Sequence, residues 1–297
     1  MLTDRHRRML ERASRAPSGH NAQPWLVRVQ SADQWIISAD PSRRLPAVDG
    51  DDRELRISLG AFVEALVIAG AAEGIRVSGR TELTLSEMTP DTSGVHELAL
   101  RRTIRGPYAS RALSAADIAA FDAHYFPPGV LREATVEATR AQALRDDAQR
   151  ELIEWIRWTK KEAEEKRDGL SLAALGIGGV TAWIAGTFMR KERLLAKSAR
   201  ESQAADAGRL IDRSGGWLVL TGADPFDVGR RLLRVWLEAR PRGIAIQPMS
   251  QALEESPWRE ALRGQLGLDE QPQMLLRVGY VKSYPPPVSL RRDVFRF

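Results

Sequence analysis

The sequence predicts an α+β protein, a sandwich in which a mixed sheet is flanked by helices. The expected strands are fewer than the expected helices, and their order along the 297 residues is not the regular β–α–β alternation of a doubly wound fold. No G-x-G-x-x-G motif follows an expected strand and no P-loop motif occurs, so a glycine-rich dinucleotide site is not predicted. Hydrophobic residues make up 43% of the chain, which suffices for a sizeable core.

The first part of the chain combines apolar helices with short strands. Helical spacing of leucine, valine and alanine predicts a long helix that Asp51 or Asp52 caps and Gly74 ends. The expected elements are a helix within residues 1–15, a strand at 25–29, a helix at 52–74 and strands at 75–77 and 81–87.

The rest of the chain, from residue 97, is expected to be mostly helical with three short apolar strands. Ser114 and Ser256 have the residue type of helix N-caps, and Pro127, Pro128 and Gly129 break the chain between two helices. The expected elements are helices at 115–124, at 134–167, up to 212, at 226–239 and after 256, strands at 217–220, 243–246 and 274–279, and an extended tail at 285–297.

The composition excludes several classes of protein. There is no cysteine, which excludes disulfides, thiolate catalysis and iron–sulfur clusters. The four histidines are scattered without an H-E-x-x-H motif, so no metal site is predicted. Lys and Arg outnumber Asp and Glu by 44 to 39, but the charges are interspersed, so we expect no nucleic-acid partner. No secretory signal is recognised, and we expect a cytoplasmic location.

Residues 170–189 need a separate interpretation because their length is close to the ~20 residues of a spanning helix. Four glycines, a serine and two threonines make membrane insertion marginal, so no membrane partner is expected. We prefer a buried helical hairpin or a lid over a pocket. A contact with a second chain stays open.

The turn at residues 16–25 is the first candidate site. Pro17, Ser18 and Gly19 form a turn that leaves backbone N–H groups unpaired, and the Asn21 amide both donates and accepts. Such a turn can hold a flat, polar-edged heterocycle by its edge. An ordinary turn followed by a buried tryptophan, Trp25, explains the same residues equally well.

A basic run forms the second candidate site. Arg101, Arg102, Thr103 and Arg105 bring three guanidinium groups and a hydroxyl within five residues, which suits a phosphate together with a second anionic site. The alternative is a basic helix end that complements the helix macrodipole.

Together the two sites resemble the nitroreductase family of FMN-dependent oxidoreductases, through the motifs Pro-Ser-x-x-Asn-x-Gln-Pro-Trp and Arg-x-Thr-x-Arg. The resemblance implies that the turn contacts the isoalloxazine ring and that Arg101 and Thr103 bind the FMN phosphate beside Arg102. It also implies that Arg105 lies at the edge of the ring, where its charge would stabilise the reduced flavin. The aromatic residue that follows this run in the family is displaced by one position, to Tyr108.

A later loop extends the resemblance. Pro248, Met249 and Ser250 lie in a stretch similar to the family loop whose backbone N–H faces flavin N5, and Met249, Ser250 or Gln251 is the expected donor. No side chain is expected to act as a catalytic acid or base, because the flavin carries the chemistry.

The order of these parts differs from that of ordinary nitroreductases, in which the basic run precedes the turn. The resemblance implies two fused halves, residues 1–96 and 97–297, that form a pseudo-dimer with one FMN site per chain. It is strongest to the long Acg-like branch, with a lid or helical insertion near 168–195. Arg291 and Arg292 resemble the basic pair that completes the phosphate site; a disordered basic tail is the alternative. A monomer and a homodimer both stay open.

The function that the resemblance implies is NAD(P)H-dependent reduction of nitroaromatic or quinone-type acceptors. The flavin takes a hydride from the nicotinamide and passes it to the acceptor. The alternative is a protein that stores or sequesters FMN with little turnover. The physiological acceptor and the choice between NADH and NADPH stay open.

Overall fold

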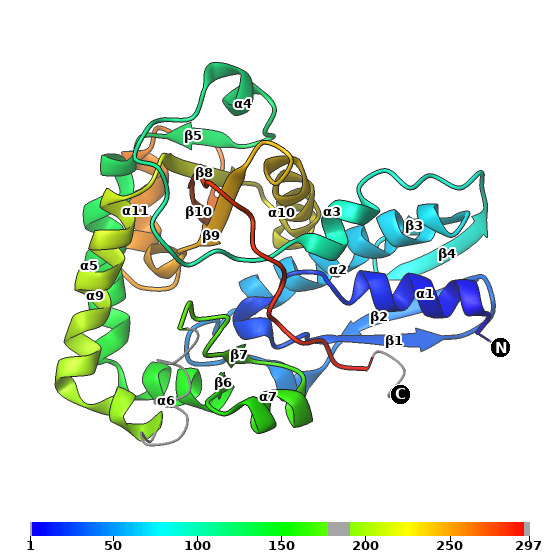
Figure 1. Ribbon diagram of the computed structural model, residues 1–297, viewed down its shortest axis with the longest axis horizontal. Helices are drawn as coiled ribbons and strands as arrows, with labels where there is room; N and C mark the ends of the chain where they lie inside the picture. Colours follow the sequence, from blue (N-terminus) through cyan, green and yellow to red (C-terminus); the bar gives the residue numbers. More distant parts are fainter. Residues whose placement is uncertain (1, 178–190, 294–297) are drawn as a thin grey trace.

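The computed structural model describes residues 2–177 and 191–293. It contains two four-stranded sheets, with two long helices, α2 and α10, between them (Figure 1). This combination of helices and sheets agrees with the predicted α+β class. The predicted hairpin or lid at 170–189 falls mostly on residues outside the described ranges.

The N-terminal sheet buries only one of its faces. Trp25 and Val27 point into the core, whereas Leu26 and Arg28, which alternate with them, are exposed; this is the pattern of a sheet with one solvated face. Helices α1 (Asp4–Ala13) and α2 (Arg53–Ala72) contribute to the core on the buried side. The strands are antiparallel and run in the order β1 (Trp25–Val29), β2 (Gln34–Ala39), β4 (Glu82–Glu87) and β3 (Ile75–Gly79).

The C-terminal sheet is covered on both faces, and every residue of its central strand β8 is buried. Leu218 and Leu220 pack with helix α10 (Pro225–Ala239), whereas Trp217 and Val219 pack with α9 (Lys197–Asp212) and α11 (Trp258–Gln265). The strands are antiparallel and run in the order β5 (His124–Phe126), β8 (Gly216–Thr221), β10 (Pro272–Tyr280) and β9 (Ile244–Pro248).

Shorter elements connect these layers. They are η1 (Gly19–Asn21), η2 (Pro41–Arg43), α3 (Val95–Leu100), α4 (Ala115–Ala119), η3 (Pro128–Leu131), α5 (Arg132–Leu144), α6 (Asp146–Trp155), β6 (Ile156–Arg157), α7 (Lys160–Lys166), β7 (Leu170–Ser171), η4 (Lys191–Leu195) and η5 (Gln251–Leu253). Helices α5 and α9 lie side by side along the C-terminal sheet (Figure 1).

Helices α2 and α10 join the two sheets through a very close crossing. A Cβ atom added at Gly60 would lie 1.8 Å from the Phe226 carbonyl oxygen, and one added at Gly229 would lie 2.0 Å from the Ile57 carbonyl oxygen. Ile57 of α2 belongs to the core of the C-terminal sheet, and Phe226 of α10 belongs to the core of the N-terminal sheet. The two cores therefore depend on one helix pair.

Helix α2 also has the composition of a membrane span. Among the described residues it is the one helix long and apolar enough to cross a membrane by length and composition. Inside this fold 72% of its most apolar window is buried, as expected for a core helix.

Several predicted elements are confirmed, and the differences have local causes. The predicted mixed sheet is wrong for the described residues, because both four-stranded sheets are antiparallel and the parallel pair is the two-residue ladder β6–β7. The predicted helix at 115–124 ends at Ala119, because His124 begins strand β5 and pairs with Val219. The predicted helix at 134–167 is divided into α5, α6 and α7.

The predicted N-caps are confirmed in part. Asp51 accepts the N–H of Arg53 at 3.4 Å and Ser114 accepts the N–H of Asp117 at 3.1 Å, whereas Ser256 as a cap is wrong. Asp49, from the preceding loop, accepts the N–H groups of Glu54 and Leu55 at 2.8 Å each, and it is the principal cap of α2. Helix α11 starts after Pro257, and the Ser256 hydroxyl hydrogen-bonds the Glu260 carboxylate instead of a backbone N–H.

Candidate functional site

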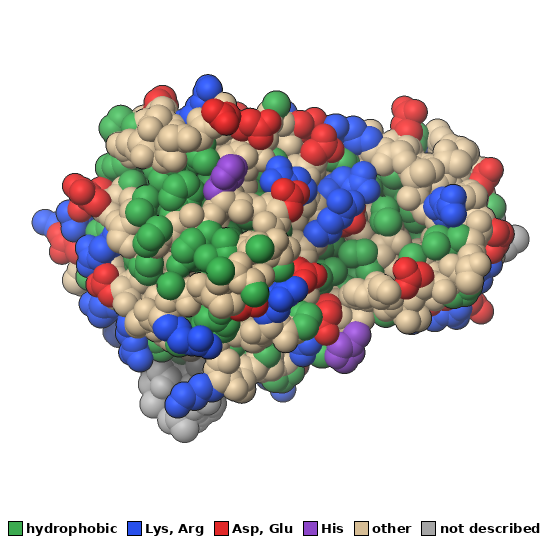
Figure 2. Space-filling model, turned by 90° about the horizontal axis from the view of Figure 1, so that it is seen from above, with side chains coloured by type: hydrophobic (Ala, Val, Ile, Leu, Met, Phe, Trp, Pro, Cys, Tyr) green, Lys and Arg blue, Asp and Glu red, His purple; other side chains and the backbone are tan. Residues whose placement is uncertain are grey.

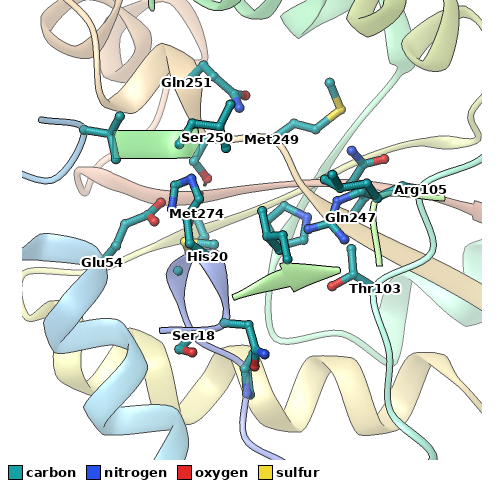
Figure 3. Close-up of a pocket in the computed structure, with 18 of the residues that line it drawn as sticks. Ser18, His20, Glu54, Thr103, Arg105, Gln247, Met249, Ser250, Gln251 and Met274 are labelled. Atoms are coloured by element: carbon teal, nitrogen blue, oxygen red, sulfur yellow. Dashed lines mark hydrogen bonds between the residues drawn. The ribbon is translucent and has the colours of Figure 1, made fainter. Parts of the chain in front are cut away.

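A cavity of about 490 Å³ lies where the turn at 17–21, the start of α2, residues 101–105, the end of β9 and the tail meet (Figure 3). This volume is within the roughly 300–1,000 Å³ of small-molecule sites. The structure places every predicted site residue except Arg292 on the cavity wall. These residues are Pro17, Ser18, Gly19, Asn21, Arg101, Arg102, Thr103, Arg105, Pro248, Met249, Ser250 and Arg291.

The turn before β1 is conformationally strained. His20, Asn21 and Gln23 have φ values of 48°, 55° and 54°, in the left-handed region that costs a non-glycine residue about 1–3 kcal/mol. The backbone N–H groups of Ser18 and His20 have no hydrogen-bond acceptor among the described residues. The turn therefore presents unpaired donors at the cavity wall, which is the arrangement that the sequence predicts.

The Asn21 side chain has a different role from the expected one. Its amide nitrogen donates to the carbonyl oxygens of Gly169 at 3.0 Å and Leu290 at 3.3 Å, and its oxygen accepts from Arg291 at 2.8 Å. Gln23 accepts from the backbone N–H of Arg292 at 2.8 Å. These two side chains fasten the C-terminal tail, which runs across the molecule to the N-terminal turn (Figure 1).

Replacing Asn21 by alanine should release the tail. Three hydrogen bonds are lost, each contributing about 1 kcal/mol, and alanine tolerates the left-handed backbone less well. We expect the free energy of unfolding in urea to fall by about 2–4 kcal/mol and trypsin to cleave after Arg291 faster. Asn21→Gly is the control for the backbone contribution, and it should release the tail with a smaller loss of stability. Wild-type cleavage rates in both variants would contradict this role.

Four arginines on the cavity wall have no carboxylate partner among the described residues. Arg101 donates to the Arg15 carbonyl at 3.0 Å and lies over the Trp236 ring at 4.7 Å. The Arg102 guanidinium donates to the Pro286 carbonyl at 2.6 Å, and its buried Nε has no partner within residues 2–177 and 191–293. Arg105 donates to the Ala174 carbonyl at 2.6 Å. Arg291 donates to the Ser14 carbonyl at 2.7 Å in addition to Asn21.

Burial of these cations is unfavourable without an anion. Desolvation lowers the pKa of Arg101 to about 10, and it also lowers the pKa values of Arg105 and Arg291. On the face shown in Figure 2, by contrast, Lys and Arg side chains lie beside Asp and Glu. The cavity cluster therefore has the charge of a binding site for an anionic group such as a phosphate.

A fully buried arginine, Arg277, holds the loop that follows Arg105 in place. The Arg277 guanidinium donates to the carbonyl of Gly106 and to the side chain of Gln247, at 2.8 and 2.7 Å. It also stacks on Tyr108 at 3.8 Å, and Tyr108 donates to the Ile104 carbonyl. Tyr108 therefore fixes the loop and does not line the cavity.

The segment directly after β9 contains the three residues expected to donate a backbone N–H to a ligand, Met249, Ser250 and Gln251. The Met249 N–H donates to the Leu275 carbonyl at 2.9 Å and is not available to a ligand. The N–H groups of Ser250 and Gln251 have no acceptor among residues 2–177 and 191–293, and both residues line the cavity. Of the three expected donors, Met249 is therefore wrong, and Ser250 and Gln251 keep N–H groups that a ligand can reach.

Arg292 is the one predicted site residue away from the cavity wall. Its guanidinium contacts the Gln23 carbonyl at 3.3 Å and the Asp40 carboxylate at 3.9 Å. The expectation that Arg292 shares the phosphate site with Arg291 is not met, because successive residues of the extended tail point in different directions.

Sequence reasoning missed the polar groups opposite the arginines. Glu54, Glu254, Gln142 and His20 line the cavity, and Figure 3 shows Glu54 and Arg105 on opposite sides with His20 between them. His20 had one available signal, its position inside the candidate turn. No signal in the sequence identified Glu54 and Glu254 as site residues, because they come from helix α2 and from the end of η5, which are distant in sequence.

Comparison with known proteins adds the following. No family model matches the chain. A Mycobacterium tuberculosis protein named as an NAD(P)H nitroreductase, Rv3131, is 30% identical over 97% of this chain and 89% of its own length. The M. tuberculosis protein named as NAD(P)H nitroreductase acg is 26% identical over 99% of this chain and 95% of its own length. The Serratia protein named as NAD(P)H nitroreductase PigM is 24% identical over 93% of this chain and 88% of its own length.

Proposed function

Because the chain belongs to the nitroreductase family, we propose that it is an FMN-dependent oxidoreductase that passes reducing equivalents from NAD(P)H to a quinone or nitroaromatic acceptor. The main observation in favour of FMN as the cofactor is the group of buried guanidiniums that have no carboxylate partners among the described residues. A dianionic phosphate would provide the missing counter-charge. The names of the relatives support a nicotinamide-dependent reductase at a coarse level.

The cavity residues fit the parts of FMN. Arg101, Arg102, Thr103 and Arg291 would hold the phosphate, since all four line the cavity and the buried Nε of Arg102 has no partner among the described residues. The turn at 17–20 and the free N–H of Ser250 or Gln251 would hold the polar edge of the ring. Arg105 would lie at the same edge and favour negative charge there.

When bound, FMN supplies the hydride chemistry. The protein's own residues bind and orient it and exclude water. The strained turn presents fixed donors, so little reorganisation is needed on binding. The buried arginines lower the energy of any anionic state formed beside them.

We also propose that the two sheets correspond to two fused halves, residues 1–96 and 97–297, with the site between them. The close crossing of α2 and α10 supports this organisation, because each helix contributes to both cores. The cavity wall combines the turn of the first half with the basic run of the second. One chain therefore supplies a full set of phosphate and ring contacts.

Anaerobic mixing of the FMN-loaded protein with NADPH, and separately with NADH, tests the proposed activity. We expect the visible absorbance of the oxidised flavin to disappear rapidly with one or both, and to return when a quinone such as menadione is added. Flavin that stays oxidised with both nucleotides would contradict a reductase and support a protein that stores FMN.

A further inference from the structure

The cavity has an acidic end opposite the arginines. The carboxyl groups of Glu54 and Glu254 both line this end, close enough for Glu54 to raise the pKa of Glu254. Gln142 donates its amide to the Glu254 Oε2 atom at 2.6 Å. Glu54 Oε2 would be 3.2 Å from a Cβ at Gly19, which places it against the strained turn. All of these residues line the same cavity.

Two buried carboxylates that lie close together repel each other, and one shared proton relieves this repulsion. Burial, followed by the charge of Glu54, raises the pKa of Glu254 well above its usual value. In the described part of the chain, the cation paired with these carboxyl groups is Arg53, whose guanidinium lies 3.4 Å from Glu54 and also donates to the Gln273 carbonyl. Burial and the close approach of the two groups therefore favour a shared proton on the pair.

The other titratable groups around the pair do not supply a second compensating charge. Burial and the charge of Glu54 raise the pKa of Asp49 to about 6, and Asp49 caps α2. Arg145 is paired with Glu255 at 2.7 Å. Burial lowers the pKa of His20, so its ring is neutral.

Two unpartnered groups indicate that a ligand reaches this end of the cavity. The buried Nδ1 atom of His20 and the buried Oε1 atom of Gln251 have no partner among the described residues. His20 senses the charges of both Glu54 and Arg105, which agrees with its position between them in Figure 3. Buried polar atoms without partners are rare and cost about 1–3 kcal/mol each, so a ligand with polar groups is expected to contact them. The Gln251 oxygen requires a donor, and the His20 Nδ1 atom donates or accepts according to its tautomer.

We propose that Glu254, sharing one proton with Glu54, is the acid that protonates the acceptor during its reduction; this rests on the function proposed above. Reduction of a quinone needs a hydride, which carries two electrons, and one proton. The hydride comes from the reduced cofactor, whose electrons come from NAD(P)H. The proton moves from the Glu254 carboxyl to the carbonyl oxygen of the quinone, which becomes the second hydroxyl of the hydroquinone. Solvent then returns a proton to the pair.

Glu254→Gln tests the proposal, because glutamine keeps the shape and the hydrogen bonds but carries no transferable proton. In anaerobic stopped-flow experiments on the FMN-loaded protein, we expect oxidation by menadione to slow by about a hundredfold, as for loss of a general acid. Reduction by NAD(P)H should keep its wild-type rate. The wild-type oxidation rate should fall as rising pH removes the shared proton, whereas the variant should be slow and independent of pH over the same range.

The control is Glu137→Gln, the same change on helix α5 outside the cavity, where Glu137 pairs with Arg140. Both half-reactions should keep their wild-type rates in this variant. Equal oxidation rates in wild type and Glu254→Gln, with the same pH dependence, would overturn the proposed acid.

A second readout does not depend on flavin or turnover. The infrared spectrum of the flavin-free wild-type protein at neutral pH should contain the band of a buried protonated carboxyl group, and Glu254→Gln should lack it. Absence of this band from the wild type would overturn the shared proton. If the band is present but no flavin binds, the proposed function fails while the carboxyl pair stands.

Discussion

Replacing Arg101 by methionine should weaken FMN binding by about a hundredfold, close to 3 kcal/mol, without destabilising the flavin-free protein. Arg101 is 6% exposed and has no carboxylate partner among the described residues. Its contacts are the Arg15 carbonyl and the Trp236 ring. The side chain is therefore unfavourable until an anion binds beside it, which is a common cost of function.

The size of this cost follows from the pKa of Arg101. Lowering this pKa from its ordinary value to about 10 corresponds to about 3 kcal/mol of destabilisation of the folded protein. The folded-state pKa of this cation is depressed, so the penalty is complete below about pH 10 and disappears as the pH rises from there toward the ordinary pKa of arginine. At neutral pH the removal of this penalty offsets the lost hydrogen bonds and the contact with Trp236.

Riboflavin and Arg111→Met provide the controls for Arg101→Met. Riboflavin lacks the phosphate, so its affinity should change little and the preference for FMN should be lost. Arg111 is an exposed arginine that stacks on Tyr280 at 3.8 Å outside the cavity, and its replacement should leave FMN affinity unchanged. Unchanged FMN affinity in Arg101→Met, measured by flavin fluorescence, would contradict a phosphate site at Arg101.

Replacing Gly60 by alanine should destabilise the fold by about 3 kcal/mol or more, because overpacking against a backbone cannot be relieved by a side-chain rotation. The added Cβ would lie 1.8 Å from the Phe226 carbonyl oxygen, so α2 and α10 would have to separate. Their separation would disturb both cores. Urea unfolding measures the loss.

Gly264→Ala is the matched control for Gly60→Ala. Gly264 is also helical, in α11, and a Cβ there would meet no atom within 4 Å. We expect this variant to be more stable by about 0.5–1 kcal/mol, because alanine favours a helix. Equal stability of the two variants would show that the helices do not cross as closely as described.

Local patterns in the sequence were sufficient for the long elements. Helices α2 and α10 were expected because their apolar residues recur at helical spacing, and their burial in the structure follows from it. The cap that Asp49 provides for α2 was not expected, because Asp49 reaches the helix from the loop before it. Strand β5 was missed because its three residues are defined by pairing with β8 and not by their own sequence.

In the candidate site, too, some residues were predictable from local motifs and others were not. The turn and the basic run were recognisable as motifs, and the fold brings them to one cavity. The carboxyl pair could not be foreseen, because Glu54 and Glu254 meet only after α2 has packed beside the C-terminal sheet. The structural role of Asn21 depends on the path of the tail, which is fixed by contacts with Arg291 and Arg292 far along the chain.

A crystal structure of the protein with FMN tests the cofactor site most directly. We expect the phosphate to contact the guanidiniums of Arg101 and Arg291, and the polar edge of the ring to lie between the turn at 17–20 and the N–H of Ser250 or Gln251. A flavin bound elsewhere, or crystals grown with excess FMN that contain none, would contradict the proposed site.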